Sequence, residues 1–187
     1  MKLALVSAVL LLLAGCTYQT FASGLKPVAQ NGWAAMPGGP NQDLGAVDYT
    51  TDNVRITISP PMWHQTSFLG PVVPIVPVSS SDNNPKLHAD FYITAYQLRG
   101  NTFAELDLRG LQLRCTRPGQ TKAEDIAYDF TAIGTIAAAI HVIPRADLRL
   151  MTTCNLHFAS VLKASPASLP DLVFNGGTIT DFGVVGP

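Results

Sequence analysis

Charged residues are scarce in this chain. Asp, Glu, Lys and Arg make up only 13% of its 187 residues, and 12 basic side chains nearly balance 13 acidic ones. The charges are scattered, without a basic stripe or an acidic tail, which argues against a nucleic-acid-binding protein. Because 47% of the residues are hydrophobic, we expect either a β-rich core or a surface that a partner covers.

Sequence signatures of catalysis are also missing. There is no Gly-x-Ser-x-Gly segment to present a nucleophilic serine, and no glycine-rich phosphate loop. Two acidic pairs occur, Glu105/Asp107 and Glu124/Asp125, but a glycosidase needs two acids that face each other across a cleft. The sequence therefore predicts a protein that is not an enzyme, and it predicts no cofactor.

The four histidines do not form a metal-binding motif. No two of them are four residues apart, as they are in a helical zinc site. His88 and Asp90 would share one face of a strand, and His64 follows Met62-Trp63, where soft ligands for copper would be available. Surface or hydrogen-bonded roles explain these residues more simply. We predict no metal site and keep His64, His88 and Asp90 as weak candidates.

A long apolar run occurs at the N-terminus. Lys2 is followed by Leu, Ala and Val residues up to Leu13, and then by Ala14-Gly15-Cys16. A basic start, a short apolar stretch and small residues before a cleavage site are features of a secretory signal. Residues 3–15 are too short for a transmembrane helix, which must cross about 30 Å at about 1.5 Å per residue.

The segment Leu13-Ala14-Gly15-Cys16 resembles the lipobox of bacterial lipoproteins. This resemblance implies that residues 1–15 are removed as a signal peptide and that Cys16 is acylated on its thiol, for example with palmitate, and on its new amine. Three acyl chains at about 0.8 kcal/mol per buried CH₂ would make the anchor effectively permanent. In this family an Asp after the cysteine resembles an inner-membrane retention signal. Thr17 stands there instead, which implies the outer membrane and leaves the membrane face open.

The other two cysteines, Cys115 and Cys154, are expected to form one disulfide, because an exported protein meets an oxidising compartment. The bridge would close a loop of about 40 residues, which the chain-entropy model values at about 4 kcal/mol. A reduced pair that binds a metal or acts in redox chemistry is the alternative.

Residues 16–46 are interpreted as the lipidated cysteine followed by a flexible tether, because glycine and proline recur through this segment. Trp33 and Met36 are exceptions. They would dock onto the domain or the lipid interface, or remain loosely packed in a loop. The folded domain is expected to span residues 47–187.

Alternating apolar and polar residues predict short strands over most of this domain. Between residues 103 and 115 the apolar face shifts by one residue, which predicts a bulge or break near Arg109-Gly110. Residues 136–143 fit either a strand or a short helix, and Asn175-Gly176-Gly177 is typical of a hairpin turn. The clearest alternations lie at 54–58, 87–98, 126–130, 152–158, 172–174 and 178–182. About seven or eight strands predict an all-β, sandwich-like domain or a related small closed sheet.

The segment from Gly70 to Val78 carries a proline at every third position: Pro71, Pro74 and Pro77. A polyproline II helix has three residues per turn, so the three prolines would form one ridge. The segment would be either a sheet edge protected against unwanted pairing or a preformed contact for a partner. Trp63 and Phe68 add apolar area nearby and complete the predicted partner-binding residues.

The sequence thus favours a lipid-anchored protein of the bacterial envelope with a structural or protein-interaction role, in a complex with other proteins or with its own copies. One alternative is a module that binds a small ligand or a metal. A less favoured alternative is an envelope hydrolase that uses the acidic pairs.

Overall fold

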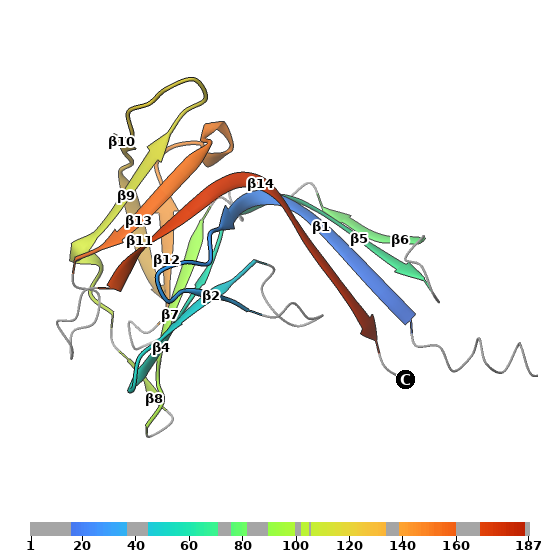
Figure 1. Ribbon diagram of the computed structural model, residues 1–187, viewed down its shortest axis with the longest axis horizontal. Coiled ribbons are helices and arrows are strands. Elements are labelled where there is room, and N and C mark those ends of the chain that lie inside the picture. The colour runs from blue at the N-terminus through green and yellow to red at the C-terminus, as the bar shows by residue number, and fades with distance from the viewer. Residues whose placement is uncertain are drawn as a thin grey trace, which may run out of the picture.

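Two antiparallel β-sheets pack face to face in the computed structural model (Figure 1). The structure describes residues 16–36, 45–70, 76–81, 90–99, 102–104, 106–133, 139–159 and 169–185. The signal peptide predicted at 1–15 lies outside these residues. The all-β, sandwich-like fold is confirmed, with more strands in the described residues than the sequence indicated.

The first sheet has the strand order β10-β9-β13-β14-β1-β5-β6. The bounds of its strands, in that order, are Glu124–Asp125, Leu111–Thr116, Thr153–Phe158, Leu169–Val185, Cys16–Pro27, Met62–Gly70 and Val76–Ser81.

The second sheet has the order β11-β12-β7-β4-β3-β2, and β8 pairs with β7. The bounds of these strands are Tyr128–Ile133, Ala139–Pro144, Phe91–Gln97, Val54–Ser59, Val47–Thr50 and Ala34–Ala35, with β8 at Thr102–Phe103. Two single turns of 3₁₀ helix, η1 (Leu108–Gly110) and η2 (Leu148–Leu150), connect strands.

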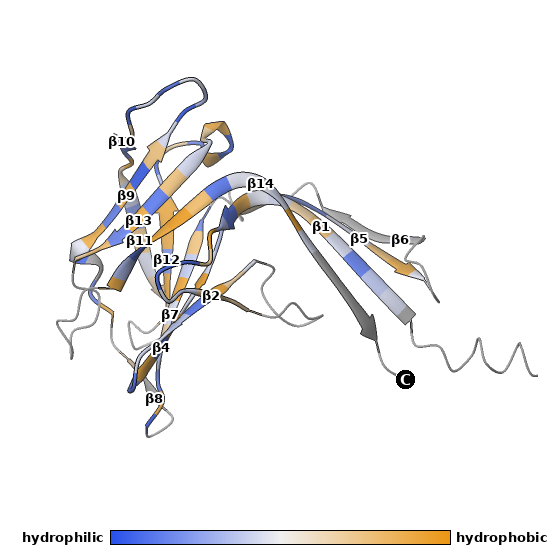
Figure 2. Ribbon diagram, in the orientation of Figure 1, coloured by the Kyte–Doolittle hydropathy of each residue, from blue (hydrophilic) through white to orange (hydrophobic). Residues whose placement is uncertain are grey.

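The core lies between the two sheets and follows the predicted alternation. Figure 2 shows the polar and apolar residues alternating along β9 and β13. Phe91 of β7 and Phe174 of β14 meet across the sandwich with ring centroids 5.1 Å apart. Because side chains alternate between the faces of a strand, one apolar series from each sheet is enough to fill this space. The fully buried series include Ile56 and Ile58, Phe91, Ile93 and Ala95, and Cys154, Leu156 and Phe158.

The predicted disulfide is present. Cys115 and Cys154 lie directly opposite each other on β9 and β13 and are fully buried. The bridge therefore joins neighbouring strands of one sheet, and it excludes the alternative of a reduced pair. The predicted break before β9 is also present, because η1 occupies residues 108–110 and resets the phase so that Leu111, Leu113 and Cys115 face inward.

Two details of the strand interpretation resolve differently. Residues 139–143 belong to strand β12, so the helix alternative is wrong there, while residues 136–138 lie outside the described part of the chain. The alternation over residues 126–130 puts Phe130 on the same face as Ile126 and Tyr128, but its side chain is 56% exposed. β11 is an edge strand, and Phe130 lies beyond the part of this strand that packs against the core.

The flexible tether predicted for residues 16–46 is wrong over the described part of that segment. β1 pairs with β14 along its whole length and with β5 on its other side. Trp33 is only 3% exposed, donates its indole N–H to the Pro170 carbonyl at 3.0 Å, and contacts the rings of Tyr49 and Phe158. Glycine and proline did not prevent ordered structure here, because distant strands supply the hydrogen bonds and the packing.

The predicted hairpin at Asn175-Gly176-Gly177 is also wrong. β14 runs without interruption from Leu169 to Val185, and it arches through this point (Figure 1). Gly177 lies opposite Gly24 of β1. Of this pair, only Gly24 lacks room for a side chain, because a Cβ there would lie 2.6 Å from the Pro61 carbonyl oxygen.

Candidate interaction surface

Part of the first sheet extends beyond the sandwich as a separate element (Figure 1). We call this element the arm. It consists of residues 176–185 of β14, 16–24 of β1, 62–70 of β5 and 76–81 of β6, in that spatial order. The two sheets packed on each other form the body. The arm begins where β1 and β5 shift register between Ser23 and Gly24.

Contacts between neighbouring strands hold the arm together. Thr20 and Ser67 share a hydrogen bond between hydroxyl groups at 2.9 Å, and the Thr17 hydroxyl donates to the Gly70 carbonyl at 3.1 Å. On the same face as Thr17, the rings of Phe21 and Phe68 meet edge to face with centroids 6.1 Å apart. These are uncharged interactions, and they link β1 to β5.

A small apolar cluster fixes the arm to the body. Ala22 of β1 and Ile179 of β14 are opposite each other and nearly fully buried, and Met62 of β5 packs against them. A Cβ added at Gly45 would lie 2.8 Å from Ile179 Cδ1, so the loop before β3 covers this cluster closely. The arm therefore leaves the body at a defined, packed junction.

The arm is almost free of charge. Asp181 is the only Asp, Glu, Lys or Arg in its four segments. Thr, Ser and Gln residues accompany the aromatic residues instead. Charged side chains are depleted at the centres of protein interfaces, whereas ordinary exposed surfaces carry many. The low charge of the arm is a feature that it shares with the centres of protein interfaces.

Both edges of the arm are open within the described residues. β13 pairs with β14 only as far as Asn175, and the Gly176 N–H still donates to the Thr152 carbonyl at 2.9 Å. From Gly177 to Val185 no described strand lies on the side of β14 away from β1. The β6 edge carries the exposed Pro77, which lacks a donor, whereas the open stretch of β14 contains no proline. An unpaired strand edge is a template for the addition of another strand.

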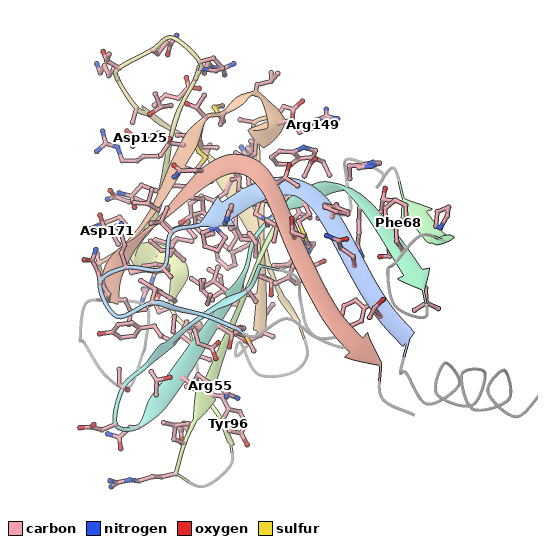
Figure 3. The ribbon with its side chains drawn as sticks, turned by 45° about the vertical axis from the view of Figure 1, so that its right-hand side comes forward. Arg55, Phe68, Tyr96, Asp125, Arg149 and Asp171 are labelled. Atoms are coloured by element: carbon pink, nitrogen blue, oxygen red, sulfur yellow. A yellow bond between two sulfur atoms is a disulfide. The ribbon has the colours of Figure 1, made fainter. Side chains whose placement is uncertain are left out.

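Three of the five residues predicted to bind a partner are described, and they lie on or beside this element. Phe68 is on β5 in the arm (Figure 3). Trp63 is half-buried at the base of β5 and packs against the main core. Pro77 lies opposite Phe68 on β6, so for this residue the interpretation as a protected sheet edge fits. Pro71 and Pro74 lie outside the described residues.

The two weak metal candidates that the structure describes, His64 and Asp90, have other neighbours. His64 Nε2 lies 3.1 Å from the Thr66 hydroxyl, and His88 is outside the described residues. Asp90 is buried and pairs with His141, whose Nε2 lies 2.6 Å from Asp90 Oδ2, and the ring of His141 stacks on Tyr92. Among the described residues, no three His, Cys, Asp or Glu side chains form a group that could hold a metal ion.

A second imidazole–carboxylate pair was not identified from the sequence. His157 Nδ1 lies 2.6 Å from Asp171 Oδ1, and the Asn155 amide donates to Asp171 Oδ2 at 3.1 Å. The pair is half-exposed on the outer face of the body, and Figure 3 shows Asp171 at the opposite end of the molecule from Phe68. The alternation in β13 places Asn155 and His157 outward, but only the strand pairing brings Asp171 to them.

The acidic pairs are engaged with arginines. Asp107 binds Arg109, and the two charges stabilise each other so that the pKa of Arg109 is raised. Glu124 and Asp125 contact Arg117 and Arg114 at 2.8 and 3.1 Å. Glu105 lies outside the described residues. Each of the three described acids thus has an arginine as its partner.

In the described part of the chain, no helix is long and apolar enough to cross a membrane. Comparisons with protein-family models, with curated proteins and with solved structures found no match for this chain.

Proposed function

We propose that this protein is a lipid-anchored structural subunit of the bacterial outer membrane that joins an envelope complex through its arm. The observation that supports this role best is the arm itself: a sheet with one charged residue, open at both edges, that extends from a well-packed body. A surface of this kind exposed alone would favour unspecific strand pairing. A bound partner removes that liability.

The position of Cys16 fits an anchor at the end of the arm. Cys16 is the first residue of β1 and lies opposite Val185, the last residue of β14. An acylated Cys16 therefore brings the tip of the arm to the membrane. β1 rises by about 3.3 Å per residue, so the stretch from Cys16 to Gly24 holds the body about 25–30 Å from the anchor. The arm then acts as a stiff spacer that also carries the contact surface.

The anchor is tested by replacing its thiol. In Cys16→Ser the acylation site is removed, and we expect the chain to lose incorporation of labelled palmitate and to leave the membrane fraction. Continued palmitate incorporation by Cys16→Ser would contradict the lipoprotein assignment.

The contact surface is tested by photocrosslinking in intact cells. A photoreactive amino acid replaces Thr180 in the arm or, as the matched control, Thr50 on β3 of the body; both are exposed strand threonines. We expect defined crosslinked species from position 180 and only background from position 50. If position 180 yields no more product than position 50, the arm is not a contact surface and the proposed role is wrong.

A further inference from the structure

We infer that the partner of the arm is a second copy of this chain, and that β14 of one copy pairs with β6 of the next. This inference rests on the proposed function, because the lipid anchor gives all arms a common direction. It goes further by naming the partner, the two strands that meet and their orientation. Copies joined in this way form a row or a closed ring.

The directions of the strands favour pairing of β14 in one copy with β6 in the next. β14 and β5 run towards the tip of the arm, and β1 and β6 run away from it, because all neighbours are antiparallel. Anchors in one membrane surface point all tips the same way. Two β14 edges would then meet in parallel, whereas β14 meets β6 in antiparallel and continues the alternation. Antiparallel pairing is the more stable of the two per residue.

The two edge strands also occupy the same cross-strand rows of the arm. The register places Thr180, Phe21, Thr66 and Ser80 in one row across the arm. By the same register, Val76 at the start of β6 lies in the row of Gly183 of β14, and Ser81 at its end lies in the row of Ile179. This interval falls inside the open stretch of β14. A neighbouring copy related by rotation about an axis along the strands thus presents its β6 beside an unpaired segment of matching length.

The residues at these levels are compatible with close approach of two copies. Asp181, the one charged residue of the arm, shares its row with Thr20, Ser67 and Ser79. A joint between β14 and β6 therefore brings no like charges together. A parallel joint between two β14 strands would place the Asp181 residues of both copies beside each other, which is unfavourable.

The use of two different edges predicts an open-ended association. An interface between unlike surfaces generates rings or filaments, whereas an interface between like surfaces stops at a dimer. Pro77 removes one donor from the β6 edge and leaves the carbonyls as acceptors.

The test uses paired cysteines in the native membrane, with oxidation before electrophoresis. Ser80→Cys is combined in turn with Thr178→Cys, Thr180→Cys and Phe182→Cys. These three pairs allow for β6 of one copy being shifted by up to two residues in either direction along β14 of the next. We expect a ladder of disulfide-linked multimers from at least one of these combinations and none from any single variant. Thr50→Cys with Ser80→Cys is the matched control and is expected to remain monomeric.

The outcomes separate this inference from the proposed function. A dimer from Thr180→Cys alone would show two β14 edges in contact and would overturn the inference. No ladder from any pair, together with photocrosslinks from position 180 to other proteins, would also overturn it and leave the proposed function standing. Neither multimers nor photocrosslinks would overturn both. As a second measurement, Thr178→Lys/Thr180→Lys is expected to abolish the multimers, while Thr50→Lys leaves them unchanged.

Discussion

The junction between arm and body is expected to depend on Gly24. A Cβ at this position would lie 2.6 Å from the Pro61 carbonyl oxygen and 2.9 Å from Met62 Cγ. The Pro61 oxygen cannot simply retreat, because it accepts the backbone hydrogen bond of Leu25 at 3.1 Å. Such overpacking costs about 1–3 kcal/mol, which outweighs the 0.5–1 kcal/mol, roughly, that alanine gains over glycine in a strand. Gly24→Ala should therefore lower the free energy of unfolding by about 1–2 kcal/mol.

Gly177 provides the matched control within the same cross-strand pair. It lies opposite Gly24, but a Cβ built on it has no atom within 4 Å. Gly177→Ala should therefore stabilise the protein by about 0.4–1 kcal/mol, through the unfolded chain. Urea unfolding of the mature protein measures the free energy of unfolding of both variants. In thermal unfolding, each kcal/mol should move Tm by roughly 2–4 °C in a chain of this size. Equal stabilities for the two variants would refute the packing argument.

Three further outcomes follow from the body. Cys115→Ala/Cys154→Ala, which opens a bridge between residues 39 apart, should lower the free energy of unfolding by about 4 kcal/mol in urea; a loss below about 1 kcal/mol contradicts the chain-entropy estimate. Trp33→Ala should cost about 3–5 kcal/mol by the same assay, whereas a loose tether residue would cost nothing. The hydrogen bond from Arg149 lowers the pKa of Asp147, so this pair stabilises the fold above the unfolded-state pKa of about 3.9, and the contribution disappears as pH falls through the lowered value. A Tm series from pH 5 to pH 2 should fall less steeply in Asp147→Asn than in the unchanged protein, and identical slopes would contradict the assignment.

Local patterns were sufficient to predict several strands of the body. Period-two alternation identified the inward residues of β4, β7 and β13 because each of these strands has one face against the core. The same alternation located the break at Arg109-Gly110, since a strand cannot change phase without an extra residue. The disulfide followed from the number of cysteines and the expected compartment. Each of these inferences needs only a short window of sequence.

The arm was missed because its strands are specified by distant partners. Residues 17 to 24 pair with residues 177 to 184 at the other end of the chain. Polar residues occupy both faces of β1 here, so the alternation that marks a half-buried strand is weak. In the same way, Gly176-Gly177 carries a strong turn signal on its own. The pairing with β1 overrides that signal, and both glycines lie inside a long, continuous strand.

The imidazole–carboxylate pair of His157 and Asp171 shows the same limit on a smaller scale. The two residues are brought together at an irregular point, where the register between β13 and β14 shifts between Leu156 and Phe158. Continuing the ladder from Asn155↔Val173 and Leu156↔Leu172 places His157 opposite Asp171, but this count requires the pairing of β13 with β14, which no local pattern predicts. Sequence periodicity predicts which face a residue takes, but the pairing of the strands decides which residue it meets.

The pairing of the two chain ends also orders the steps by which the arm forms. β1 is the first described strand and β14 the last, and they are paired from Cys16↔Val185 to Pro27↔Phe174. The other neighbour of β1 is β5, which meets it only from Thr17 to Gly24. β1 therefore cannot take its central place in the sheet until β14, the last described strand, is available to pair with it.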